Sequence, residues 1–228
     1  MNTARTLLIA GLAAAAATPG PARARETPLE FTLSVTRQDL GFDYPGDVET
    51  RYTQAVVTLL ERSYPYLHGG FRLGLSDLSQ SGNPPTAGQD LTGGSVGFVL
   101  RSEVPLGGGF GTYLQGAYDY HTVDASTDSD PNVSRVQLDW FDFTGRAGLS
   151  GRRGPLQLRA GPFVRFVDGD ERDRGDVDRT LHLRAADKGG GFLDVVYHVD
   201  RTGWVGLRLE RGSRDAAWLR FTRLFDYD

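Results

Sequence analysis

Hydrophobic and polar residues alternate along most of this chain, from about Leu29 to Phe225. The alternating segments are roughly ten residues long, and breaks rich in glycine, proline and aspartate separate them. A period of two places the hydrophobic side chains of an extended strand on one face and the polar ones on the other. In the first segment the hydrophobic face carries Leu29, Phe31, Leu33 and Val35. The pattern predicts an all-β fold built from many short strands.

We expect ten strands, with eight as the alternative count. The ten segments span approximately Leu29–Arg37, Arg51–Arg62, Leu67–Asp77, Leu91–Val104, Phe110–His121, Arg135–Ser150, Pro155–Val167, Gly191–Asp200, Trp204–Arg211 and Ala216–Phe225. A further short alternation, Leu181–Ala185, is assigned to an extended eighth strand or to its loop. Counting it separately would give eleven strands and would place the two ends of the chain on opposite sides.

The breaks between the segments alternate in length. Those after the second, fourth, sixth and eighth segments are short, whereas those after the first, third, fifth and seventh are long and polar. Transmembrane β-barrels have short turns on the periplasmic side and longer loops outside. The alternation therefore predicts an antiparallel up-and-down transmembrane β-barrel with both termini in the periplasm. A change of phase between Trp140 and Phe141 predicts a β-bulge, or the point where that strand leaves the membrane.

The two faces of the segments differ sharply in charge. One face carries Leu, Val, Phe, Tyr and Gly. The other carries Arg72, Arg101, Arg146, Arg159, Arg165, Arg208 and Arg220, with Glu30, Glu103, Asp119, Asp142, Asp194 and Glu210. Period alone does not say which face is inside, because a soluble lipocalin-like barrel has the opposite arrangement.

The aromatic residues favour the membrane arrangement. One group lies near the short turns: Tyr64, Tyr66, Phe110, Trp204, Phe225 and Tyr227. A second group lies near the long breaks: Tyr118, Tyr120, Trp140, Phe166 and Trp218. Two aromatic belts about one strand length apart are typical of a bilayer-spanning barrel. We therefore expect the hydrophobic face to contact lipid and the charged face to line the lumen.

The first 24 residues have the features of a cleaved signal peptide. Arg5 precedes an apolar run from Leu7 to Ala17, and Ala22-Arg-Ala24 provides a cleavage site. We expect residues 25–228 to form the barrel domain. Of 25 basic residues the leader holds Arg5 and Arg23, which leaves 23 against 29 acidic residues and a net charge near −6. An acidic chain argues against a nucleic-acid partner, and the absence of cysteine excludes disulfides and thiolate metal sites.

The last strand carries a resemblance to a known group of proteins. Leu219, Phe221, Phe225 and Tyr227 share one phase in the segment Ala217–Asp228. With the strand pattern of residues 25–228, this resembles the broad group of small Gram-negative outer-membrane β-barrel proteins. The resemblance implies an outer-membrane location, contact with lipid and lipopolysaccharide, and a terminal strand read by the outer-membrane assembly machinery. Arg223 in an apolar slot and the final Asp228 depart from that pattern.

The charges of the polar face permit two interpretations. In a narrow barrel they pair across the lumen and fill it, which predicts a structural or surface-interacting protein. In a wider lumen the same charges form the filter of a narrow channel for small solutes.

An enzyme active at the outer rim is the third hypothesis. Outer-membrane enzymes resembling omptin proteases or lipid A hydrolases need histidine with Asp or Ser at the outer rim, and His121 with Asp119 is the candidate pair. The acidic segment Asp168–Asp178 lacks the ligand spacing of a calcium loop and contains arginines, so we expect a solvated outer loop. We expect no metal site and no cofactor.

Overall fold

The computed structural model describes residues 28–44, 47–86, 90–130, 133–175 and 178–225, which form eleven antiparallel strands and a short 3₁₀ helix. The strands are β1 (Leu29–Leu40), β2 (Glu49–Tyr64), β3 (Leu67–Ser81), β4 (Asp90–Gly107), β5 (Phe110–Asp130), β6 (Val133–Arg153), β7 (Leu156–Gly175), β8 (Arg179–Arg184), β9 (Gly189–His198), β10 (Gly203–Gly212) and β11 (Arg214–Phe225), and η1 (Pro84–Thr86) is the helix. No helix in this part of the chain is long or apolar enough to cross a membrane.

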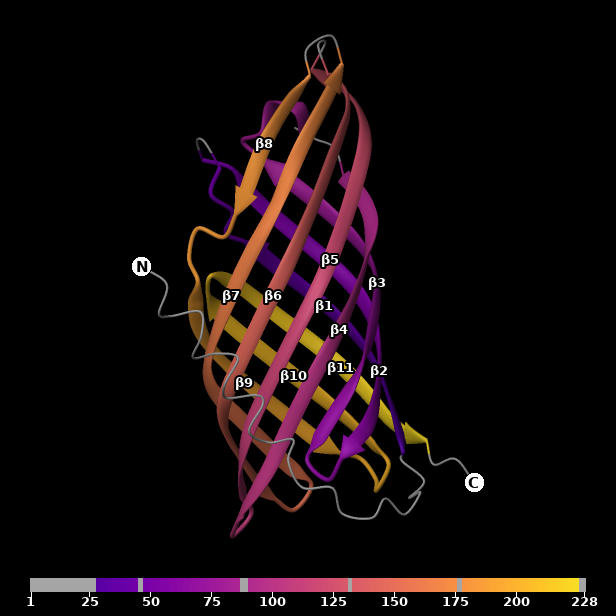
Figure 1. The fold of residues 1–228 in the computed structure, drawn as a ribbon, viewed down its shortest axis with the longest axis vertical. Coiled ribbons are helices and arrows are strands. Elements are labelled where there is room, and N and C mark those ends of the chain that lie inside the picture. Colours follow the sequence, from indigo (N-terminus) through magenta and orange to yellow (C-terminus); the bar gives the residue numbers. More distant parts are fainter. Residues whose placement is uncertain (1–27, 45–46, 87–89, 131–132, 176–177, 226–228) are drawn as a thin grey trace.

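Ten of these strands close into a barrel (Figure 1). Strands β1 to β7 pair in chain order, β9 follows β7, and β11 returns to pair with β1. Closure confirms the predicted up-and-down barrel of ten strands, and the alternative count of eight is wrong. Leu29 pairs with Phe225, so the first and last strands start and end side by side. We call this the short-turn end, and the opposite rim the long-hairpin end.

The extra strand β8 belongs to the same edge of β7 as β9. β9 pairs with β7 up to Val164, opposite Gly189, and β8 resumes the pairing at Asp168, opposite Arg184. Between these two pairings, the four residues 185–188 lie opposite the three residues 165–167 of β7. β8 and β9 are therefore one strand interrupted by a bulged segment, which agrees with the predicted extended eighth strand.

The barrel wall is uneven in height. Strands β5, β6 and β7 are 21, 21 and 20 residues long, whereas β9 and β10 have 10 each. In Figure 1, β5–β7 reach the upper tip of the molecule and β9–β11 stay in its lower half. The expected polar loops 122–134 and 168–180 were therefore largely wrong: both are mostly strand. An antiparallel hairpin satisfies its own backbone hydrogen bonds even where no hydrophobic face remains.

The hydrophobic face points outward, as predicted. Phe71, Leu73 and Leu75 on β3 project from the barrel, and Leu75 is 76% exposed. Arg72, between them in sequence, points inward and is paired with Asp119. A soluble barrel would bury the apolar residues instead. The outer surface therefore provides the apolar band that lipid tails require.

The predicted bulge at Trp140 and Phe141 is wrong. Pairing of β5 with β6 is unbroken from Phe110 opposite Gly151 to Ser126 opposite Arg135. The alternation therefore continues, and Val136, Leu138 and Trp140 point inward while Phe141 points outward. The hydrophobic positions change face because the lumen itself becomes apolar at the long-hairpin end.

The aromatic belts are incomplete for the same reason. Near the short turns Tyr64, Tyr66, Phe110 and Phe225 are exposed, and Tyr118, Phe141 and Phe166 are exposed farther along the barrel. Trp140 and Trp218, expected in the second belt, are buried inside, and Trp204 lines the lumen. Tyr227 lies outside the described residues.

The last strand presents Leu219, Phe221 and Phe225 on the outward face, in one phase. Arg223 shares this face, and its Nη1 lies 2.8 Å from Oδ2 of Asp200 in the β9–β10 turn. Hydrogen bonds from the backbone N–H and hydroxyl of Thr202, with that of Arg223, hold the pKa of Asp200 at about 2. Arg223, which departs from the apolar pattern of the last strand, thus forms an ion pair at the short-turn end.

The outward placement of Leu73 generates a first prediction. Leu73→Arg puts a guanidinium into the apolar band, and we expect it to lower the free energy of unfolding in lipid vesicles by about 2–4 kcal/mol. The control is Asp77→Arg, which is on the same face of β3 but beyond the apolar band, and should change it by less than about 1 kcal/mol. Urea titration in vesicles measures both. Equal effects would contradict a lipid-facing band.

Candidate functional site in the barrel lumen

All thirteen charged residues of the predicted polar face point into the lumen, and each of them takes part in an ion pair on the inner wall. Their distribution follows from strand alternation, because residues two apart on one strand share a face. The structure adds Arg214, which is also buried inside. With Arg214 the ion-paired part of the inner wall carries eight arginines and six carboxylates, and Glu171 and Asp173 are buried farther along β7. The arginines are Arg72, Arg101, Arg146, Arg159, Arg165, Arg208, Arg214 and Arg220, and the carboxylates are Glu30, Glu103, Asp119, Asp142, Asp194 and Glu210.

Three arginines share the carboxylate of Asp194, which is fully buried on β9. Arg208 Nη2 lies 3.0 Å from Oδ2 and Arg159 Nη1 lies 3.5 Å from the same oxygen, while Arg220 pairs with Oδ1. Arg159 on β7 and Arg208 on β10 are the cross-strand neighbours of Asp194. Arg159 also reaches Glu103 at 2.8 Å. This cluster has more positive than negative charge.

A second cluster joins Asp142 and Glu210. Arg165 Nε donates to Asp142 at 2.8 Å, and Arg146 Nε donates to Glu210 at 2.5 Å. Arg214 bridges the two carboxylates, with Nε 2.9 Å from Glu210 and Nη1 3.6 Å from Asp142. Arg214 is not among the predicted residues because it follows Gly212 and Ser213, in the break between the ninth and tenth predicted segments. The sequence feature that could have identified it is its spacing: Arg214 lies an even number of residues from Trp218 and Arg220, and therefore faces the same side of the strand.

Two further pairs lie toward the β1–β5 side of the lumen. Arg101 makes a bidentate pair with Glu30, at 2.8 and 2.5 Å, the geometry that best matches a guanidinium to a carboxylate. Arg72 pairs with Asp119. Gly97 faces this second pair from β4, and a Cβ there would overlap Asp119 Oδ1. Small residues on the inner face therefore make room for the charged side chains.

At the long-hairpin end, an apolar cluster replaces the charges. We call it the apolar plug, and its buried residues are Leu40, Phe42, Tyr52, Leu78, Leu91, Val123, Val136, Leu138, Trp140, Val167 and Leu183. Trp140 contacts Phe42 and Tyr52 edge to face, with ring centroids 5.8 and 5.5 Å apart. Contacts of this kind, together with burial of large rings, stabilise a water-free cluster. The plug residues face the lumen on the long-hairpin side of the charged region.

The candidate catalytic pair does not form. His121 is 6% exposed, lies inside the barrel and stacks on Trp140, with ring centroids 4.7 Å apart. Its Nδ1 is hydrogen-bonded to the hydroxyl of Tyr52 at 2.8 Å. Asp119 shares the inward face but pairs with Arg72. The expectation of a His–Asp pair at the outer rim is therefore wrong, because both side chains point into the lumen.

The acidic segment 168–178 is also organised differently from the expected solvated loop. Glu171 and Asp173 are buried on the inner side of β7. Glu171 accepts hydrogen bonds from the Tyr44 hydroxyl at 2.5 Å and from Asn83 Nδ2 at 2.9 Å, and Asp173 pairs with Arg179 at 2.5 Å. These contacts join the β1–β2 and β3–β4 connections to β7. In the described part of the chain, no group of three or more His, Cys, Asp or Glu side chains is placed to hold a metal ion.

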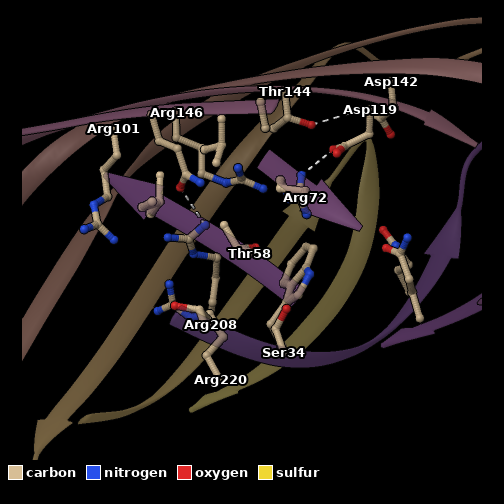
Figure 2. Close-up of a pocket in the computed structure, with 18 of the residues that line it drawn as sticks. Ser34, Thr58, Arg72, Arg101, Asp119, Asp142, Thr144, Arg146, Arg208 and Arg220 are labelled. Atoms are coloured by element: carbon tan, nitrogen blue, oxygen red, sulfur yellow. Dashed lines mark hydrogen bonds and ion pairs between the residues drawn. The ribbon is translucent and has the colours of Figure 1, made fainter. Parts of the chain in front are cut away.

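Between the ion pairs the lumen retains a cavity of about 90 Å³ (Figure 2). Figure 2 shows Arg101, Arg146, Arg208 and Arg220 in one part of it, and Arg72, Asp119 and Asp142 in another. This volume is enough for a few water molecules or one small ion, and is far smaller than an open pore.

Comparison with known proteins identifies the fold. No known protein-family profile and no curated protein matches the chain. The translocator domain of the autotransporter NalP from Neisseria meningitidis is similar, with 9% identity over 98% of this chain and 95% of that one, and a TM-score of 0.50. The β domain of the Bordetella autotransporter Brka has 10% identity over 89% and 100%, and a TM-score of 0.47. The outer membrane protease OmpT from Escherichia coli has 8% identity over 87% and 93%, and a TM-score of 0.42. The likeness to the NalP translocator domain, together with the closed antiparallel barrel, shows the fold of outer-membrane β-barrels.

The Asp194 cluster generates a second prediction. Asp194→Asn keeps the shape of the side chain but leaves three guanidinium groups without their shared carboxylate. We expect the free energy of unfolding to fall by about 3–5 kcal/mol. The control is Asp39→Asn, which removes an exposed pair with Arg51 at 3.4 Å and should cost no more than about 1 kcal/mol. Denaturant titration followed by tryptophan fluorescence measures both; similar costs would contradict a buried, shared carboxylate.

Proposed function

We propose that this protein is an integral outer-membrane β-barrel whose closed lumen serves stability, and that it acts as a structural or surface-interacting protein. The observation that carries the proposal is the apolar plug above the ion-paired lumen. A conducting channel needs a continuous hydrated path, and the burial of the plug residues, with Trp140 at 1% exposure, supports a lumen that lacks one. The lumen cavity of about 90 Å³ lies within the charged region, and a second cavity of about 520 Å³, which shares Leu40 and Arg214 with it, lies by the β10–β11 turn.

The exterior supports the location. Large apolar side chains cover the outward face of strands from β1 to β11, and aromatic residues are exposed near the short turns. We assign the short-turn end to the periplasm and the long-hairpin end to the cell exterior, because outer-membrane barrels have this asymmetry. The expected partners are membrane lipid, lipopolysaccharide and, through Leu219, Phe221 and Phe225, the outer-membrane assembly machinery. The signal peptide at residues 1–24 would supply export.

The tall side of the wall supports a surface role. Beyond the apolar band β5–β8 present charged side chains to solvent, including the pair Arg135–Asp124 at 2.6 Å and Arg172, which lies 3.3 Å from the less exposed Asp139. Charged, exposed hairpins of this kind suit contact with the phosphate and sugar groups of lipopolysaccharide. The alternative, a narrow channel for small solutes, predicts steady conductance and can be distinguished by recording currents through the protein.

Single-channel recording in planar bilayers tests the closed lumen. We expect no steady conductance from the unchanged protein. The double change Phe42→Ala and Trp140→Ala removes two rings from the plug and should produce steady, anion-selective conductance, because arginines outnumber carboxylates below it. The control is Phe141→Ala, which removes the neighbouring ring on the outward face.

Heat-modifiable mobility in SDS gels must first show that each variant folds, since each large-to-small change inside costs about 3–5 kcal/mol. Steady conductance from the unchanged protein would overturn the proposal in favour of a channel. A folded double variant that stays closed would show that the plug is not what blocks the lumen.

A further inference from the structure

The lumen cavity has a marked excess of positive charge in its lining. Seven arginines line it, whereas only three carboxylates do. The arginines are Arg72, Arg101, Arg146, Arg159, Arg208, Arg214 and Arg220, and the carboxylates are Glu30, Asp119 and Asp142. Asp194, Glu103 and Glu210 pair with several of these arginines but are not part of the lining. Charge inside the cavity is therefore unbalanced even where the wall itself is paired.

Buried nitrogen atoms without partners mark one part of this lining. The Nε atoms of Arg159, Arg208 and Arg220 are buried and have no hydrogen-bond acceptor. All three side chains already share Asp194, which has only two oxygens to offer. Buried donors nearly always have an acceptor, because leaving one unsatisfied costs free energy. A bound anion would accept hydrogen bonds from these donors and would also balance the excess positive charge of the cavity.

Positive and negative side chains occupy different parts of the cavity, which indicates where an anion would bind. Figure 2 places Arg208 and Arg220 close together, with Arg101 and Arg146 in the same part of the cavity, whereas Asp119 and Asp142 lie apart from them. The hydrogen bond that holds Arg146 to Glu210 comes from its Nε and not from its terminal nitrogens. Guanidinium groups bind oxyanions with paired N–H donors, and phosphate and sulfate suit several arginines at once.

We infer that this cavity binds a small tetrahedral oxyanion, of the phosphate or sulfate class, between Arg146, Arg208 and Arg220. The anion enters from the short-turn end, because the apolar plug closes the other end. Glu103, which lies near the short β4–β5 turn, retains solvent contact on that side and is 27% exposed. With the orientation of the proposed function, the site exchanges with the periplasm.

The test uses the folded full-length barrel in a zwitterionic detergent. Its unfolding temperature is measured against phosphate and sulfate at constant ionic strength, with gluconate, which is too large for the cavity, as the balancing anion. We expect phosphate or sulfate to raise the unfolding temperature in a saturable manner, and isothermal titration calorimetry to give one site per chain.

Two variants address the residues. Arg220→Gln removes one donor and should weaken phosphate binding at least tenfold, while Arg223→Gln, three residues away on the outward face of β11, should leave it unchanged. Gln115→Glu places a carboxylate beside Arg208, whose Nη1 it already meets at 3.0 Å. This variant should be more stable without phosphate and should lose the phosphate response, so it remains informative where Arg220→Gln does not fold.

The inference is overturned where the unchanged protein responds to phosphate, sulfate and gluconate alike, or where Gln115→Glu retains the full phosphate response. An unfolding temperature that rises with chloride but not with phosphate or sulfate would also overturn the oxyanion assignment. None of these results depends on conductance, so failure of the anion site and failure of the closed-lumen proposal are distinguishable.

Discussion

The structure depends on pairing the charges that strand alternation places inside the barrel. With lipid outside, every second residue of each strand must be apolar, and the remaining residues face a narrow lumen. A guanidinium there has limited access to water, so a carboxylate on a neighbouring or opposite strand must replace its hydration. Asp194, shared by arginines from β7, β10 and β11, shows how a single carboxylate connects strands that are not adjacent in sequence. These pairs also fix register, because a shift of one residue would move them to the lipid face.

The sequence predicts the two faces and the number of strands because both depend on local patterns. Leu29 to Val35 alternate wherever the strand lies, and the inward arginines follow from the same phase. The identity of each ion-pair partner depends on register and closure, which no single segment contains. Arg214 shows the limit: next to Gly212 and Ser213 it has the local character of a turn, and only pairing of β11 with β1 makes it an inward residue.

Trp140 shows a second kind of limit. Val136, Leu138 and Trp140 form a regular hydrophobic face, and local pattern alone favours placing that face toward lipid. Their inward position is decided by residues far away in sequence, such as Leu40, Tyr52 and Leu183, which meet them across the lumen. The hydrophobic positions change face at Phe141 because the lumen is apolar on one side of this point and charged on the other. The strand itself continues without a bulge.

The uneven wall explains why the plug forms where it does. Because β10 and β11 turn at Ser213, β8 rises above them with one edge unpaired, and such an edge must be covered or it pairs with other chains. The segment after β1 covers it: Phe42 bridges Ala185, Asp43 N–H donates to Arg184 O at 2.8 Å, and Ala186 N–H donates to Gly41 O at 2.9 Å. This pairing brings the Phe42 ring over the lumen, where it meets Trp140 at 5.8 Å. Closing the edge of the sheet and closing the lumen are thus done by the same few residues.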